Sequence, residues 1–186
     1  MNYLWKNDLF GPGWRIYTGI GIQVPSGTSY PWDVFSTQAD SVPHSHLVTG
    51  DGNYQLLLRT ELFHRSDFPV ATGLFMRVRI PLFNPTTAYF PGDGLTFLWE
   101  NYLQSVHLFD STPLIGLVFR GRSAEKWGEE RWPNSGGVQL DLKAGWITEF
   151  SESWAGVLEW RIPLTARLTG AQLTGYSVGV SLRHGL

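Results

Sequence analysis

The chain has 186 residues and a formal net charge of −2, so it is long enough for one domain and has no strongly basic field for nucleic acid. It contains no cysteine, which excludes disulfides, thiol catalysis and cysteine-based metal sites. Arginine outnumbers lysine 11 to 3, a ratio that favours crowded ion-pair networks over open, solvated surfaces.

Alternating apolar and polar residues fit eight segments that are bounded by Gly, Pro, Asn, Asp and Ser. Each segment has about 9–13 residues, and a tilted strand needs about 9–11 to cross a bilayer. Residues 1–13 are left as an N-terminal segment without an assigned structure, ahead of a single domain at 14–186. The predicted strands are Trp14–Val24, Tyr54–His64, Val70–Leu82, Leu95–Gln104, Pro113–Arg122, Val138–Ile147, Trp154–Leu164 and Gly175–Leu186.

The two faces of these strands differ in charge. One face has no Asp, Glu, Lys or Arg in any strand, and it includes Leu58, Val78, Leu117 and Leu142. The other face has all the strand charges, and we expect most of them to form an ion-pair network inside the protein. The predicted network consists of Arg59, Glu61, Arg77, Arg79, Glu100, Arg120, Arg122, Asp141, Lys143, Glu159 and Arg161.

Alternation alone leaves open which face is inside. A soluble, lipocalin-like lipid carrier has the apolar face inside, whereas a transmembrane barrel has it outside. The charged face also holds many glycines, which leave room for long side chains in a narrow lumen. We therefore predict an all-β, up-and-down antiparallel transmembrane β-barrel of eight strands, with Leu58, Val78, Leu117 and Leu142 facing lipid. The soluble carrier is the alternative.

The connections between the predicted strands alternate between long and short, as in outer-membrane barrels with short periplasmic turns and long external loops. The sequence thus predicts a bacterial outer-membrane location with membrane lipid or detergent as partner and no nucleic acid. The first residues lack the features of a signal peptide, so we expect either that a signal was replaced by Met1 or that the chain is truncated. The oligomeric state is left open.

Four segments in the correct order carry a family resemblance: Ile20–Gly27, Pro43–Tyr54, Asn134–Gly137 and Leu168–Leu173. They resemble a glycine-rich strand and turn, a His-Leu…Gly-Thr-Gly-Ser-Tyr segment, an Asn-Ser-Gly-Gly strand entry and a Leu-Asn-Gly-Glu-Gln-Leu loop. The family is that of the outer-membrane transporters of the phenol-degradation meta pathway. The resemblance implies a transporter or channel for small solutes, hydrophobic ones among them. It also implies a signal peptide and additional strands ahead of this C-terminal eight-strand portion.

The strand count favours a different function, a non-conducting scaffold or adhesin, because side chains fill an eight-stranded barrel. His44-Ser45-His46 leaves a third function open, an outer-membrane lipid hydrolase, and the two imidazoles are also a candidate metal site, but a polar loop explains these residues better. Asp51-Gly-Asn53 and Gly92-Asp-Gly94 are oxygen-rich but fit Asx turns. The segment Glu125–Trp132 is a candidate for lipopolysaccharide contact or a solvated loop tip. We expect no enzymatic activity, cofactor or metal site.

Overall fold

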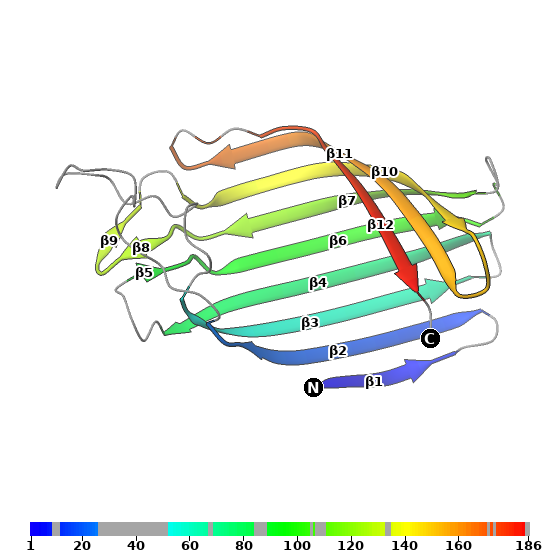
Figure 1. Cartoon of the computed structure of the whole chain (residues 1–186), viewed down its shortest axis with the longest axis horizontal. Helices are drawn as coiled ribbons and strands as arrows, with labels where there is room; N and C mark the ends of the chain where they lie inside the picture. Colours follow the sequence, from blue (N-terminus) through cyan, green and yellow to red (C-terminus); the bar gives the residue numbers. More distant parts are fainter. Residues whose placement is uncertain are drawn as a thin grey trace.

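The computed structural model describes residues 1–8, 12–25, 52–66, 69–83, 89–104, 106, 111–132, 135–170, 172 and 174–184. These residues form a nine-stranded antiparallel sheet and a small three-stranded sheet (Figure 1). The large sheet consists of β1 (Asn2–Asn7), β2 (Gly13–Gln23), β3 (Tyr54–Arg65), β4 (Val70–Phe83), β6 (Gly94–Leu103), β7 (Ser111–Arg122), β10 (Gly137–Glu149), β11 (Trp154–Leu168) and β12 (Ser177–His184). The small sheet consists of β5 (Tyr89–Phe90), β8 (Lys126–Trp127) and β9 (Glu130–Arg131).

The large sheet is an up-and-down meander, in which each strand pairs with the next one along the chain that belongs to this sheet. The sheet curls, so that β12 crosses in front of its middle strands in Figure 1. β1 and β12 lie at opposite edges of the sheet order, so the sheet is not closed. The prediction of an all-β antiparallel meander is confirmed, whereas closure into a barrel stays a prediction.

The predicted number of eight strands is wrong, because β1 adds a ninth strand to the large sheet. β1 pairs with β2, and its register shifts between Leu4 and Lys6. This irregularity places Trp5 beside Thr18, whose hydroxyl accepts a hydrogen bond from the indole Nε1 at 2.9 Å. The shift interrupts the period-2 pattern, which explains why alternation did not reveal a strand within residues 1–13.

All eight predicted strands form, and their bounds differ from the predicted ones by at most four residues. The connections alternate in length as expected. β2, β4, β7 and β11 terminate at one end of the sheet, where the longer connections follow, and β3, β6 and β10 terminate at the other, where the shorter ones follow. We call these ends the long-loop end and the short-turn end. No helix occurs among the described residues, and hence none that is long and apolar enough to cross a membrane.

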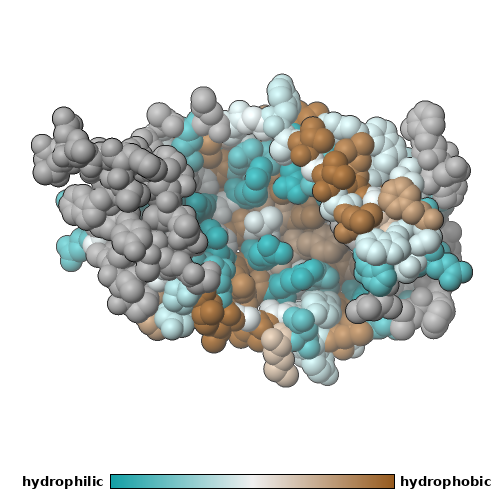
Figure 2. Space-filling view, viewed as in Figure 1, coloured by the Kyte–Doolittle hydropathy of each residue, from teal (hydrophilic) through white to brown (hydrophobic). Residues whose placement is uncertain are grey.

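The inner face of the sheet contains buried charges beside a few buried apolar side chains, such as Leu114 and Val118. Among the described residues, eight polar or charged side chains are buried but only five hydrophobic ones are, so this fold is not built around an apolar core. The buried polar residues on the strands include Gln55, Glu100, Asp141 and Lys143, which lie at the alternate positions that were predicted to form the charged face. Figure 2 shows hydrophilic side chains in the hollowed centre of the molecule.

The outer face is apolar and exposed. Leu58, Val78, Leu117 and Leu142 lie on it, where Leu58 pairs with Val78 and Leu117 pairs with Leu142. Many large side chains of the same parity are more than one-third exposed, for example Ile115 at 47%. Soluble monomers rarely expose a continuous apolar surface of this extent. Further examples are Ile20, Ile22, Met76, Leu95, Phe97, Trp99, Val138, Leu158, Ile162, Val178, Val180 and Leu182.

Aromatic pairs lie near the strand ends. At the short-turn end, Trp14 contacts His64 with ring centroids 4.4 Å apart, and Trp154 contacts His184 at 4.7 Å. At the long-loop end, Tyr54 stacks on Phe83 at 4.5 Å. Rings at both ends of an apolar surface are typical of the interfacial girdles of membrane barrels.

Candidate functional site

The inner face holds all eleven residues of the predicted charge network, on strands β3, β4, β6, β7, β10 and β11. The register between these strands decides which charges meet. Carboxylates lie in the middle and toward the short-turn end, whereas most arginines lie toward the long-loop end. The structure therefore divides the predicted network into ion-paired groups and two arginines that pair with none of its carboxylates.

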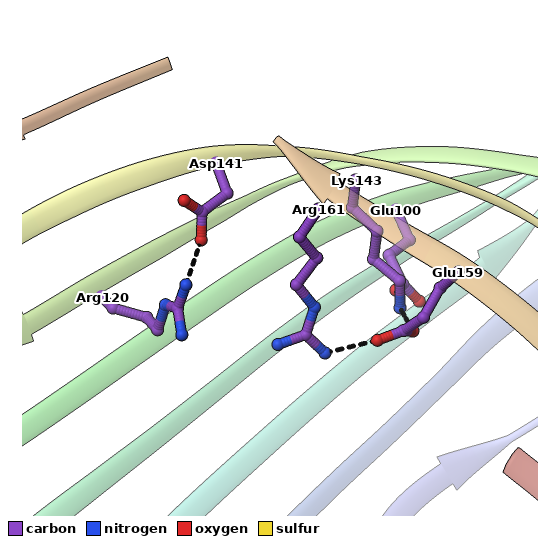
Figure 3. Close-up of polar contacts among 6 residues, drawn as sticks. All are labelled: Glu100, Arg120, Asp141, Lys143, Glu159 and Arg161. Atoms are coloured by element: carbon purple, nitrogen blue, oxygen red, sulfur yellow. Dashed lines mark hydrogen bonds and ion pairs between the residues drawn. The ribbon is translucent and has the colours of Figure 1, made fainter. Parts of the chain in front are cut away.

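The largest paired group is the buried ion cluster of Glu100, Lys143, Glu159 and Arg161 (Figure 3). The Lys143 ammonium forms ion pairs with Glu100 of β6 and with Glu159 of β11, the latter at 2.7 Å. Arg161 donates to the other oxygen of Glu159 at 2.6 Å. The Lys143 side chain is only 6% exposed, so this cation is held almost entirely by the two carboxylates.

Glycine makes this cluster possible. Gly116 of β7 pairs with Glu100 on one side and with Lys143 on the other. The two charged side chains therefore meet across a position of β7 that has no side chain. A Cβ at Gly116 would overlap the carbonyl oxygen of Trp99 and lie 3.2 Å from the Glu100 side chain. Gly179 of β12 likewise lies against Glu159, and a Cβ added at Gly179 would lie 3.0 Å from Glu159 Cγ. The glycine-rich charged face thus accommodates long charged side chains.

Three further ion pairs lie on or beside the inner face. Arg120 pairs with Asp141, which is 1% exposed and also accepts a hydrogen bond from Gln139 Nε2 at 2.6 Å. Arg59 pairs with Glu61, two residues along β3. Arg122 pairs with Glu125 at 2.8 Å.

The network prediction omitted Glu125 and Tyr102. Glu125 follows the end of β7, outside the predicted strands, although its i,i+3 spacing from Arg122 is a signal that the sequence contains. Tyr102 has the same parity as Glu100, and its hydroxyl donates to that carboxylate at 2.5 Å. Its position two residues from Glu100 on the same face of the strand was therefore the sequence feature that could have identified Tyr102.

Arg77 and Arg79 were predicted as members of the ion-pair network, but neither forms an ion pair with any carboxylate of the described residues. The register explains the difference. Arg77 lies opposite Arg59 and Thr96, and Arg79 lies opposite Leu57 and Gly94. Their cross-strand neighbours therefore contribute no negative charge.

Among the described residues, the inner face lines a larger and a smaller open cavity. The larger one, about 890 Å³, lies toward the long-loop end and is lined by the five arginines Arg59, Arg77, Arg79, Arg120 and Arg122, together with Glu125 and uncharged residues. The smaller one, about 440 Å³, is lined by Arg15, Tyr17, Arg59, Glu61, Phe63, Phe75 and Tyr102. Arg59 borders both. An interior filled by side chains had been expected for eight strands, but the side chains of the described residues leave these two spaces open.

Only some of the other candidate sites lie within the described residues. His44, Ser45, His46 and Asp51 lie outside the described residues. The backbone N–H of Asp93 donates to Ser123 Oγ at 2.8 Å, so the Gly92-Asp-Gly94 segment joins two loops. Within the described ranges, no group of three or more His, Asp or Glu side chains is placed to hold a metal ion.

The segment 125–132 contributes β8 and β9 of the small sheet at the long-loop end, where β8 also pairs with β5. The carboxylate of Glu125 faces Arg122, and its backbone N–H donates to Ser135 Oγ at 2.9 Å. The segment is thus folded onto the neighbouring loops at this end of the sheet. Contact with lipopolysaccharide stays a prediction.

No protein-family model, curated protein or solved structure matches the chain. The resemblance to the transporters of the phenol-degradation meta pathway therefore stays a prediction.

Proposed function

We propose that this chain forms a transmembrane β-barrel wall in the bacterial outer membrane, and that its polar interior is a passage for small solutes. The observation that carries the proposal is the reversed polarity of the sheet. Charged side chains such as Glu100 and Lys143 are buried, while apolar ones such as Ile115 and Phe97 are exposed. A soluble lipid carrier needs the opposite arrangement.

The dimensions and the aromatic pairs support the same proposal. β4 has 14 residues and β10 has 13, enough for a tilted strand to cross an apolar layer about 25 Å thick. Aromatic pairs at both strand ends fit the two interfaces of such a layer. An outer face that contacts lipid also explains how so many apolar side chains remain exposed.

A membrane also places a requirement on the sheet edges. Unpaired backbone N–H and C=O groups are too costly in hydrocarbon, so the outer edges of β1 and β12 need a partner there. All eight neighbouring pairs of the nine-stranded sheet are antiparallel, which makes β1 and β12 parallel to each other. Closure therefore needs either a parallel β1–β12 pair or an additional strand between them.

Two neighbouring residues of β6 test the orientation of the sheet. The chain has no cysteine, so Thr96→Cys and Phe97→Cys each give a single site for a fluorescent label. Thr96 lines the larger cavity, whereas Phe97 is 40% exposed on the outer face. In refolded vesicles, nitroxides on the lipid acyl chains should quench the label at position 97, and aqueous iodide the label at position 96. The opposite pattern, or iodide quenching at both positions, would overturn the proposal.

A non-conducting scaffold is the second candidate, and the buried ion cluster favours it. Lys143 links β6 to β11 across the inner face, which leaves less room for a solute in that region. Planar-bilayer recordings of the refolded chain separate the two functions. Steady single-channel steps support a passage, whereas a silent membrane together with the expected labelling pattern supports the scaffold.

A further inference from the structure

We propose that the five arginines at the long-loop end form a binding site for a small organic or inorganic oxyanion, such as a carboxylate or phosphate. We call Arg59, Arg77, Arg79, Arg120 and Arg122 the arginine belt. This inference rests on the proposed function, since it names the class of solute that the interior takes. This class differs from the hydrophobic solutes that the family resemblance includes.

The register builds the belt from four consecutive strands of the sheet. Arg59 of β3 lies directly opposite Arg77 of β4, so two guanidinium groups share one cross-strand pair. Thr96 then separates Arg77 from Arg120, and in the next row Gly94 separates Arg79 from Arg122. Like charges in directly opposite positions destabilise a sheet. The ion pair with Glu61 offsets the charge of Arg59 but not that of Arg77.

The charge of the belt is not balanced by the described residues. Glu61, Asp141 and Glu125 pair with three of the five guanidinium groups, which leaves an excess of two positive charges. The excess belongs to Arg77 and Arg79. A planar guanidinium binds carboxylate and phosphate through two parallel hydrogen bonds, so an oxyanion is the ligand that fits these two groups.

The belt is also accessible. The side chains of Arg59, Arg120 and Arg122 are 54%, 44% and 40% exposed despite their ion pairs. The Arg79 guanidinium lies over Gly94, with Nε 3.5 Å from the position that a Cβ would take there. The absence of a side chain at Gly94 thus leaves space beside Arg79. The cavity of about 890 Å³ is within the usual size range of small-molecule sites.

Calorimetric titration of the refolded full chain in zwitterionic detergent tests the site without requiring transport. The probes are inorganic phosphate and succinate, with glycerol as the neutral control. We expect both oxyanions to bind at one site, and the double variant Arg77→Gln/Arg79→Gln to weaken binding about tenfold or more. Arg15→Gln is the matched control, because Arg15 lines only the smaller cavity, and it should leave binding unchanged.

Three results would overturn the site: no oxyanion binding at millimolar concentration, equal binding by the double variant, or equal weakening by Arg15→Gln. A difference between phosphate and succinate would identify which oxyanion the belt prefers. The cysteine labels separate this inference from the proposed function. Lipid quenching at position 97 without oxyanion binding contradicts only the belt, whereas oxyanion binding without lipid quenching contradicts only the membrane barrel.

Discussion

Lys143 is the residue whose replacement perturbs the interior most directly. Its side chain is 6% exposed between Glu100, at 5%, and Glu159, at 18%. Lys143→Met keeps an unbranched side chain but leaves both carboxylates without their shared cation. Removing one partner of a buried ion pair costs about 3–5 kcal/mol. Because Tyr102 still donates to Glu100 and Arg161 still pairs with Glu159, we expect the lower end, about 3 kcal/mol.

Urea unfolding of the refolded protein in vesicles measures this loss, with the fluorescence of its nine tryptophans as the signal. Arg161→Gln is the control, because that side chain is 35% exposed and its pair should contribute at most about 1 kcal/mol. Adding Glu100→Gln to Lys143→Met should recover part of the loss by removing one unpaired charge. A Lys143→Met variant within about 1 kcal/mol of the original stability would refute the reasoning.

Three further perturbations concern the outer face, two glycines of β7 and the first turn. Phe97→Arg should destabilise the vesicle-embedded protein by about 2–4 kcal/mol in urea unfolding, and Thr96→Arg clearly less; equal losses would contradict an outer face in lipid. Gly116→Ala should cost about 1–3 kcal/mol, because its Cβ would overlap a backbone carbonyl of β6. Gly121→Ala, whose Cβ would meet its nearest atom at 3.5 Å, should be tolerated, and equal unfolding midpoints for both would contradict the packing. A backbone N–H of β2 and the Lys6 ammonium lower the pKa of Asp8 below 3.8, so the turn keeps this contribution above about pH 4 and loses it as the pH falls through the lowered pKa. An NMR titration midpoint of the Asp8 carboxyl at or above 3.8 would contradict this contact.

Alternation was sufficient to locate the long strands, because each has one charged and one apolar face. It was sufficient even for β11, whose register shifts opposite Leu140 and Asp141, since the shift lies close to its predicted end. It failed for β1, where the shift beside Trp5 breaks the pattern within six residues. A ninth strand changes how the sheet can close. The alternation pattern of a single strand does not predict how the edges of a sheet meet.

Parity also selected the inner charges but not their partners. Which charges meet depends on strand register, and the positions of Arg77 and Arg79 beyond the carboxylates follow from that register. The link between Glu100 and Lys143 depends on a glycine in the strand between them, a relation among three strands. The sequence therefore predicted that the five arginines share one face. It did not predict that two of them would lack a carboxylate partner among the described residues.

The orientation of the sheet in a lipid bilayer is the central claim, and spin labels along β4 test it most directly. Single-cysteine variants at successive positions from 72 to 80 place labels on alternate faces of a strand that contacts two neighbours. We predict that accessibility to oxygen, which concentrates in lipid, peaks at the even positions, such as Met76 and Val78. Accessibility to a water-soluble nickel chelate should peak at odd positions such as Arg77. An oxygen maximum at the odd positions, or no period of two, would contradict the account.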